Sequence, residues 1–325
     1  MRCISRAKSA ALVCVVSVSL FTGGCIGGKG ATPVTAYELK NYNQNLYQGK
    51  LYAEDLCVAQ NDVALEGYTE DTELHSAALF DLTGERVLYS YKAHERLYPA
   101  STTKIMTALL AIENADLDAQ VTISGNADAS SFSADAQVCG LAKGEVWTLR
   151  DLLGALLLYS GNDAATAIAE YVGGSEDAFV NMMNRRAQEL MANGTHFMNP
   201  HGLHDDNHYT TAYDLYLIFK EAVKYDTFVD TVSSKDYTMT YTTPKKTQIN
   251  EYMQSTNYYL LNEFPVPEGV VMYGGKTGTT SMAKSCLILM TKNKKGERFF
   301  SVVLGAETKD VLYSSMSQLL EKTAN

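Results

Sequence analysis

Positive charge is scarce in this sequence, in which 27 lysines and arginines stand against 37 aspartates and glutamates. Three of the basic residues, Arg2, Arg6 and Lys8, fall in the first 24 residues, and without them 24 basic residues face 37 acidic ones, a net charge of −13. A protein that binds nucleic acid needs a concentrated positive surface. We therefore expect no nucleic-acid partner.

Cysteine is also scarce, since the chain has six cysteines and no C-x-x-C pair. Two of them lie in the first 24 residues and a third is Cys25, which leaves Cys57, Cys139 and Cys286. Three thiols cannot all pair within one chain, so a disulfide framework is not indicated. The lack of C-x-x-C also removes the usual sequence signal for a zinc or thiol redox site.

The longest apolar run, from Ala10 to Phe21, is shorter than the segment that a permanent transmembrane helix usually needs. It follows a basic start and precedes the small residues of positions 22–24, which is the plan of a cleaved export signal over 1–24. The site before Cys25 resembles a bacterial lipobox, in which the cysteine becomes the lipidated first residue, although Thr22 stands where that pattern prefers leucine. We expect lipidation of Cys25, with plain signal cleavage as the alternative.

The remaining chain reads as a tether and leading segment over 25–74, followed by one folded domain over 75–325. Apolar residues make up 46% of the sequence, enough for a full core. A hairpin is predicted around Thr83-Gly84, and helices over 148–160 and 163–172 and after Ser175 up to Gly194. Strands or long loops are predicted between 226 and 267, and then three strands and a closing helix. This order predicts an α+β fold, an antiparallel sheet built from distant segments and covered by helices.

The chemically promising stretch is "PASTTKIMTALLA", which places Ser101 and Lys104 three positions apart where a helix begins. Positions i and i+3 share one helix face, so the amine can reach the hydroxyl. Serine becomes a good nucleophile only when a base removes its proton, and lysine can act as that base only if its pKa falls towards neutral. The alternative is that Ser101 caps the helix and Lys104 is a solvated first-turn lysine.

Two further tripeptides strengthen the catalytic interpretation. S-G-N at 160–162 lies between two predicted helices, and K-T-G at 276–278 follows two glycines on a predicted strand, where glycine often marks close approach of a ligand or backbone. Each alone is typical of a turn or a strand end. The three motifs follow one another with 59 residues from Ser101 to Ser160 and 116 from there to Lys276. We therefore do not attribute their occurrence in this order to chance.

With these three elements, the chain resembles the serine-type D-alanyl-D-alanine carboxypeptidases, the low-molecular-mass penicillin-binding proteins. The stretches "LLLYSGNDAATAIAE", "NPHGLHDDNHYTTAYDL" and "GGKTGTT" also look like that family, and the resemblance runs from about His75 to the last helix. It implies a β-lactamase/DD-peptidase-like fold with a helical subdomain. It also implies an exported enzyme that removes the terminal D-alanine from peptidoglycan stem peptides and is acylated by β-lactam antibiotics, with no metal or organic cofactor.

The resemblance implies a role for each motif residue. Ser101 would be the nucleophile and Lys104 its base, Ser160 with Lys276 would pass a proton to the leaving amine, and Asn162 would orient Lys104 and the substrate amide. Substrate binding would fall to the strand around Gly278: Lys276 and Thr277 would hold the terminal carboxylate. The backbone N–H groups of Ser101 and Thr279 would form the oxyanion hole.

Two other functions share these motifs. A class A β-lactamase needs a carboxylate base in an E-x-x-N loop, and none of the seven glutamates between Asp163 and Gly275 has asparagine three residues later. Penicillin should therefore acylate Ser101 and stay. The second alternative is a non-catalytic wall-binding or sensor lipoprotein of the same fold. Many family members also carry a further β-rich domain, but only 47 residues follow Gly278, so we expect no C-terminal β domain.

The histidines in "NPHGLHDDNHYTT" offer a competing interpretation. A zinc site could be formed by the side chains of His201, His204 and His208, with Asp205 and Asp206 between them. However, the run is rich in loop formers, and it lacks the helical H-E-x-x-H arrangement that makes histidines converge. We expect a hydrogen-bonded loop beside the helix that starts near Thr211.

Overall fold

The structure is a computed structural model, and it describes residues 56–58, 61–68 and 71–324. The predicted signal over 1–24, Cys25 and most of the predicted tether lie outside these residues. Within the described part of the chain, no helix combines the length and the apolar character that crossing a bilayer requires.

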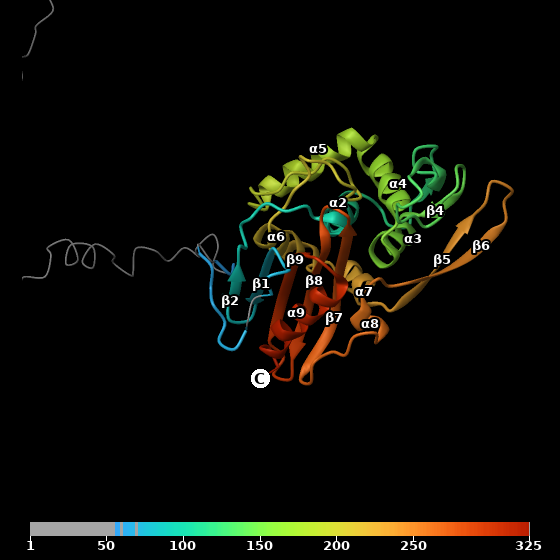
Figure 1. Ribbon diagram of the computed structural model, residues 1–325. Helices are drawn as coiled ribbons and strands as arrows, with labels where there is room; N and C mark the ends of the chain where they lie inside the picture. The colour runs from blue at the N-terminus through green and yellow to red at the C-terminus, as the bar shows by residue number, and fades with distance from the viewer. Residues whose placement is uncertain (1–55, 59–60, 69–70, 325) are drawn as a thin grey trace, which may run out of the picture. The chain divides into compact units, whose positions relative to one another are not determined.

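A five-stranded antiparallel sheet in the order β2-β1-β9-β8-β7 forms the centre of the fold (Figure 1). Its first and last strands along the chain are neighbours, since Ala78 of β1 pairs with Val302 of β9. This is the antiparallel sheet of distant segments that the sequence predicts, and the hairpin around Thr83-Gly84 forms its β1–β2 edge. The strands are β1 (Ser76–Asp81), β2 (Arg86–Tyr91), β7 (Val270–Thr280), β8 (Lys284–Asn293) and β9 (Arg298–Ala306).

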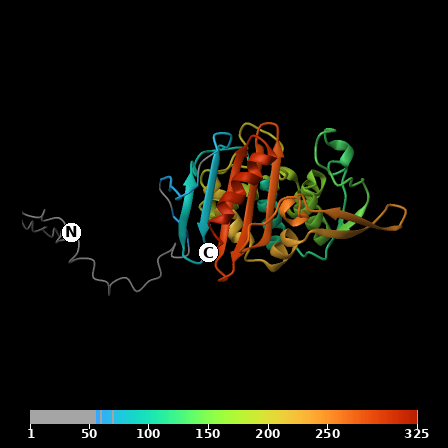
Figure 2. The same cartoon turned by 60° about the horizontal axis from the view of Figure 1, so that its bottom comes forward.

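Alternating side chains give the sheet two buried faces. In β1, Ala78 and Phe80 join the core on one face, whereas Ala77 and Leu79 join the core on the other. Helix α9 (Lys309–Glu321) lies across the second face, where Tyr259 joins the same core (Figure 2). The first face is covered by several helices, among them α2 (Lys104–Asn114), α4 (Asn162–Gly173), α5 (Glu176–Glu189) and α6 (Ala212–Ala222).

A second, four-stranded sheet in the order β3-β4-β5-β6 was not predicted, because its strands are short or widely separated along the chain. The β5–β6 hairpin projects away from the main sheet (Figure 1). This part of the fold comprises β3 (Gln120–Thr122), β4 (Val146–Thr148), α3 (Leu149–Gly154), α7 (Asp226–Ser233), β5 (Asp236–Thr242), β6 (Gln248–Gln254) and α8 (Tyr258–Leu261).

Three element boundaries differ from the prediction. Residues 226–233 form helix α7, because Phe228 and Val232 stand four residues apart and are both buried, which outweighs the Thr and Val content. Helix α3 ends at Gly154 and continues as one π-helical turn. Helix α5 ends at Glu189, five residues before Gly194, because Met191 adopts the left-handed conformation (φ 63°) that usually calls for glycine.

The described residues before 75 pack on the domain that the sequence places after that residue. Cys57 is fully buried, and its backbone N–H donates to the Tyr216 hydroxyl over 3.0 Å. Val63 bridges to Ser90 of β2. These contacts tie the leading segment to the outer end of the sheet and to helix α6.

Candidate active site

Ser101 lies in a short 3₁₀ helix, Ala100–Thr103, that leads directly into α2. No side chain caps this start, so the Ser101 hydroxyl is not used as a cap. Ala100, one residue earlier, has φ 48°, a left-handed conformation that costs free energy for any residue with a Cβ. The surrounding fold therefore imposes a strained backbone just before the serine.

Lys104 is completely buried, and its amine contacts three oxygen atoms. Its Nζ lies 3.0 Å from Ser101 Oγ, 2.7 Å from Asn162 Oδ1 and 2.7 Å from the carbonyl oxygen of His201. Burial, together with the positive charge of Lys276, lowers the pKa of Lys104 well below its ordinary value. The alternative of a solvated first-turn lysine is wrong, and this amine has the low basicity that a general base for serine needs.

Ser160 occupies a left-handed position (φ 72°) at the end of the π-helical turn Ala155–Tyr159. This sharp reversal presents both Ser160 and Asn162, which opens α4, to the same side. The Ser160 hydroxyl accepts a hydrogen bond of 2.9 Å from Lys276 Nζ, which also donates to the Thr277 carbonyl over 3.0 Å. Lys276 is only 1% exposed, and burial lowers its pKa to about 7.

Strand β7 brings K-T-G against the serine. A Cβ built on Gly278 would lie 2.8 Å from the backbone nitrogen of Ser101 and 3.0 Å from that of Thr102, so only glycine allows this approach. Because β7 is an edge strand, its outer edge has no neighbour in the sheet. That edge offers backbone groups with which an extended peptide could pair.

Two cavities flank Ser101. The first, of about 250 Å³, is lined by Ser101, Ser160 and 277–279 of β7, and beyond them by Thr256, Tyr258, Lys309, Leu312 and Tyr313. The second, of about 380 Å³, is lined by Ser101, Asn162 and 279–281, and by Asp135, Gln137 and His204 among others. The amines of Lys104 and Lys276 lie behind this wall and contact the two serines. The structure thus brings all eight residues proposed from the sequence to one cleft.

Sequence reasoning missed Asp163, the residue after S-G-N. It is fully buried, and its carboxylate accepts hydrogen bonds from the backbone N–H groups of Cys139, Gly140, Leu141 and Ala164. It thereby anchors the loop on the near side of the cleft. An acid in the first helical turn is too common for its burial to be predicted.

Lys309 was also missed, although the sequence carried a signal. It is the first residue of α9, where a positive side chain faces the positive end of the helix dipole. Its Nζ donates to the Tyr258 hydroxyl over 2.7 Å and lies 4.6 Å from the centre of that ring. A cation in this unfavourable position, at the edge of a cleft, points to a role in binding.

The three histidines lie in separate hydrogen-bonding environments. The His208 ring makes two hydrogen bonds, one with Thr103 Oγ1 over 2.8 Å and one from the backbone N–H of Met198 over 3.1 Å. Burial lowers the pKa of His208 to about 4. His201 holds Lys104 through its carbonyl oxygen, and His204 stacks edge-on against Tyr98. Within the described residues, no group of three or more His, Cys, Asp and Glu side chains is placed to hold a metal ion.

The comparison with protein families decides the assignment. The D-alanyl-D-alanine carboxypeptidase family, peptidase family S11, matches residues 64–308. This chain belongs to that family. The D-alanyl-D-alanine carboxypeptidase DacF of Bacillus subtilis is 36% identical over 252 residues, which cover 77% of this chain and 61% of DacF. DacC of Escherichia coli is 32% identical over 249 residues, covering 74% and 59%. The chain thus spans about three fifths of the length of these relatives.

A solved structure of the family supports the fold. The crystal structure of the Streptomyces K15 DD-transpeptidase is 28% identical in sequence and aligns with a TM-score of 0.71, over 79% of this chain and 98% of that one. The resemblance and the α+β fold predicted from the sequence are therefore confirmed.

Proposed function

We propose that this S11 family member is a serine DD-carboxypeptidase, which releases the terminal D-alanine from peptidoglycan stem peptides. The observation that carries the proposal is the 3.0 Å separation of Lys104 Nζ and Ser101 Oγ, made by an amine whose environment disfavours its charged form.

Acylation follows from this geometry. Neutral Lys104 takes the proton of Ser101, and Ser101 Oγ attacks the carbonyl carbon between the two D-alanines. The oxygen of the tetrahedral intermediate would accept from the backbone N–H groups of Ser101 and Thr279, a placement supported by the close approach at Gly278. Asn162, which already accepts from Lys104 over 2.7 Å, keeps the amine directed at Ser101.

Release of D-alanine requires a proton on its amine. The Ser160 hydroxyl can give that proton and recover one from the Lys276 ammonium group, which lies 2.9 Å away. The C–N bond then breaks and leaves an ester on Ser101. The proton that Lys104 took from Ser101 must then return to Lys276, so that Lys104 is neutral again before the second step. Water attacks the ester, Lys104 accepts the proton of the water and gives it to Ser101 Oγ as the ester bond breaks, and the shortened peptide leaves with a new carboxylate.

The terminal carboxylate of the substrate needs a hydroxyl and a fixed positive charge. Thr277 Oγ1 faces the first cavity and lies 2.6 Å from Thr256 Oγ1. Burial lowers the pKa of Lys276 to about 7, and its amine is engaged by Ser160, so we assign the counter-charge of the substrate carboxylate to Lys309, which lines the same cavity. In this assignment Lys276 serves mainly the proton transfer.

The site of action is proposed from the sequence of the first 25 residues. A signal over 1–24 would export the protein, and lipid on Cys25 would hold it at the outer face of the cytoplasmic membrane, where stem peptides are found. Mass spectrometry of the intact mature protein distinguishes a lipidated Cys25 from a cleaved, unmodified terminus.

Labelled penicillin and a D-Ala-D-Ala pentapeptide test the function together. The wild type should retain the label and release D-alanine, and Ser101→Ala should do neither. Lys104→Ala should lose nearly as much activity, because the two residues act as a unit, with a fall of roughly 10⁴-fold or more in kcat. A wild type without label would contradict the proposal. Label without D-alanine release would indicate the wall-binding alternative, and loss of the label within minutes would indicate a β-lactamase.

A further inference from the structure

The residues that line the two cavities indicate the direction in which a substrate peptide would lie along β7. Thr277 and Lys309 mark the carboxylate end, in the first cavity. The second cavity is lined by the next part of the same edge strand, Thr279, Thr280 and Ser281. Strand residues advance about 3.3 Å each, so a peptide paired with this edge places the residue before the acylated D-alanine in the second cavity.

The lining of the second cavity includes one carboxylate. Among the residues that line it, Asp135 is the acid, no lysine or arginine is present, and His204 is the other titratable group. The first cavity, in contrast, is lined by the ammonium group of Lys309. The linings of the two cavities beside Ser101 therefore carry charges of opposite sign.

Asp135 is an exposed residue on a loop that is fixed to the catalytic elements. The backbone N–H of Ala136 closes a turn on the Ser133 carbonyl over 3.0 Å, and the Asn162 N–H donates to the Gln137 carbonyl over 2.8 Å. Hydrogen bonds from the Ser133 side chain and from its own backbone lower the pKa of Asp135, so the group is ionised at neutral pH. A fixed negative charge thus faces the space next to the acylation site.

We propose that Asp135 is a specificity residue that binds the side-chain ammonium group of the diamino acid preceding D-Ala-D-Ala. This inference rests on the proposed carboxypeptidase function. A stem peptide carries its diamino acid directly before the two D-alanines. The side chain of lysine ends in a primary amine, and that of diaminopimelate ends in a primary amine with a carboxylate on the same carbon. The cavity suits such a chain, and a carboxylate at its edge favours the charged amine over a blocked one.

Two peptides that differ in one acetyl group test this proposal. The wild type should release D-alanine from Nα-acetyl-Lys-D-Ala-D-Ala with a kcat/KM roughly three- to tenfold above that for the Nα,Nε-diacetyl peptide. Asp135→Asn should lower the first value to the second. Asp135→Lys should reverse the preference. The control Asp236→Asn, at the exposed start of β5 and outside both cavities, should keep it.

The outcomes separate this proposal from the function on which it rests. Equal rates on the two peptides, or a preference that survives in Asp135→Asn, would overturn the role of Asp135 while the carboxypeptidase function stands. Absence of D-alanine from every peptide would instead count against the function. A lysine pentapeptide and a diaminopimelate pentapeptide compare the two sources of the amine. Asp135→Asn should lower kcat/KM for the peptide whose amine Asp135 binds, and no loss on either peptide would overturn the proposal.

Discussion

At the scale of single residues, two buried lysines each contact one serine of the candidate site. Lys104 contacts Ser101, and Lys276 contacts Ser160, at 3.0 and 2.9 Å between the amine and the hydroxyl oxygen. The positive charge of Lys276 is, after burial, the main influence that lowers the pKa of Lys104. A protonated Lys276 therefore helps to keep Lys104 neutral, which is the combination that acylation needs.

The pH dependence of kcat/KM should show the titration of both Lys104 and Lys276. Below the pKa of Lys104 the base is protonated, so kcat/KM should fall at acidic pH. Above about 7 Lys276 loses the proton destined for the leaving amine, so kcat/KM should fall again. A pH profile of D-alanine release measures both limbs. In Lys276→Arg the guanidinium stays charged, and the basic limb should disappear even though the maximum rate is lower; a basic limb unchanged in this variant would contradict the assignment.

Lys309 should matter for substrates with a free terminal carboxylate. Lys309→Met should raise the KM for D-Ala-D-Ala peptides roughly tenfold, because the carboxylate loses its permanent counter-charge. A peptide with an amidated C-terminus should be cleaved equally poorly by both proteins. Lys309→Arg should restore most of the affinity, whereas a merely structural role for the contact with Tyr258 would affect both kinds of peptide alike.

At the scale of elements, the site depends on how closely β7 approaches the turn before α2. Gly278→Ala should reduce penicillin acylation by roughly 10²-fold, because the new methyl group would meet the Ser101 and Thr102 nitrogens and push the strand away. The thermal unfolding temperature should change much less. Gly125→Ala is the matched control, since a Cβ there has no neighbour closer than 3.9 Å. Wild-type acylation by Gly278→Ala would show that this contact does not set the site.

Local patterns explain which elements could be predicted. The β1–β2 hairpin, the last three strands and α9 follow from alternation, turns and helical spacing within each segment. Ser101 and Lys104 lie one helical turn apart, so their contact is local as well. Helix α7 was misread because Thr and Val are ambiguous until Phe228 is known to be buried.

Contacts between distant segments explain what could not be predicted. Three hydrogen bonds to Asp163 join loop 139–141 to α4, and the carbonyl of His201 reaches Lys104 across 97 positions of sequence. Neither of these contacts can be predicted from the spacing of residues along the sequence. In the second sheet, β4 likewise pairs with β5, which lies more than 80 residues later in the chain. Such residues can be recognised as functional only once the chain is folded.

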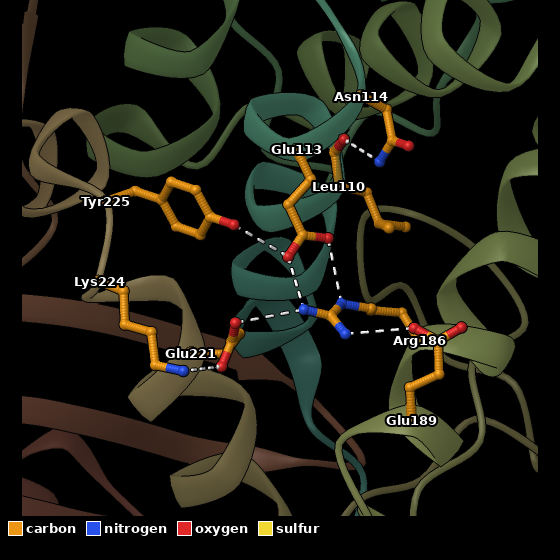
Figure 3. Close-up of polar contacts among 8 residues, drawn as sticks. All are labelled: Leu110, Glu113, Asn114, Arg186, Glu189, Glu221, Lys224 and Tyr225. Atoms are coloured by element: carbon orange, nitrogen blue, oxygen red, sulfur yellow. Dashed lines mark hydrogen bonds and ion pairs between the residues drawn. The ribbon is translucent and has the colours of Figure 1, made fainter.

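At the scale of the whole molecule, one arginine joins the helices that surround the site. Arg186 of α5 makes two hydrogen bonds to Glu113, at the end of α2, over 2.7 and 3.1 Å (Figure 3). It also reaches Glu221 of α6 over 3.3 Å and Glu189 over 3.2 Å. Arg186, Glu113 and Glu221 are 22%, 15% and 19% exposed, so these charges are mostly withdrawn from water.

This cluster should stabilise the fold without taking part in the chemistry. Replacing Arg186 by methionine leaves the mostly buried Glu113 without a counter-charge, whereas Glu221 keeps its ion pair with Lys224 at 2.6 Å. Unfolding should therefore become easier by about 2–3 kcal/mol, seen as a loss of roughly 5–10 °C in Tm. Glu113 stands nine residues after Lys104 on α2, about 13 Å along the helix, so the acylation rate of the folded protein at 25 °C should be unchanged. Arg185→Gln removes the neighbouring exposed charge and should alter neither quantity. An acylation rate that fell together with Tm in Arg186→Met would instead mean that the far end of α2 holds Lys104 in place, and that the catalytic geometry is a property of the whole helical layer.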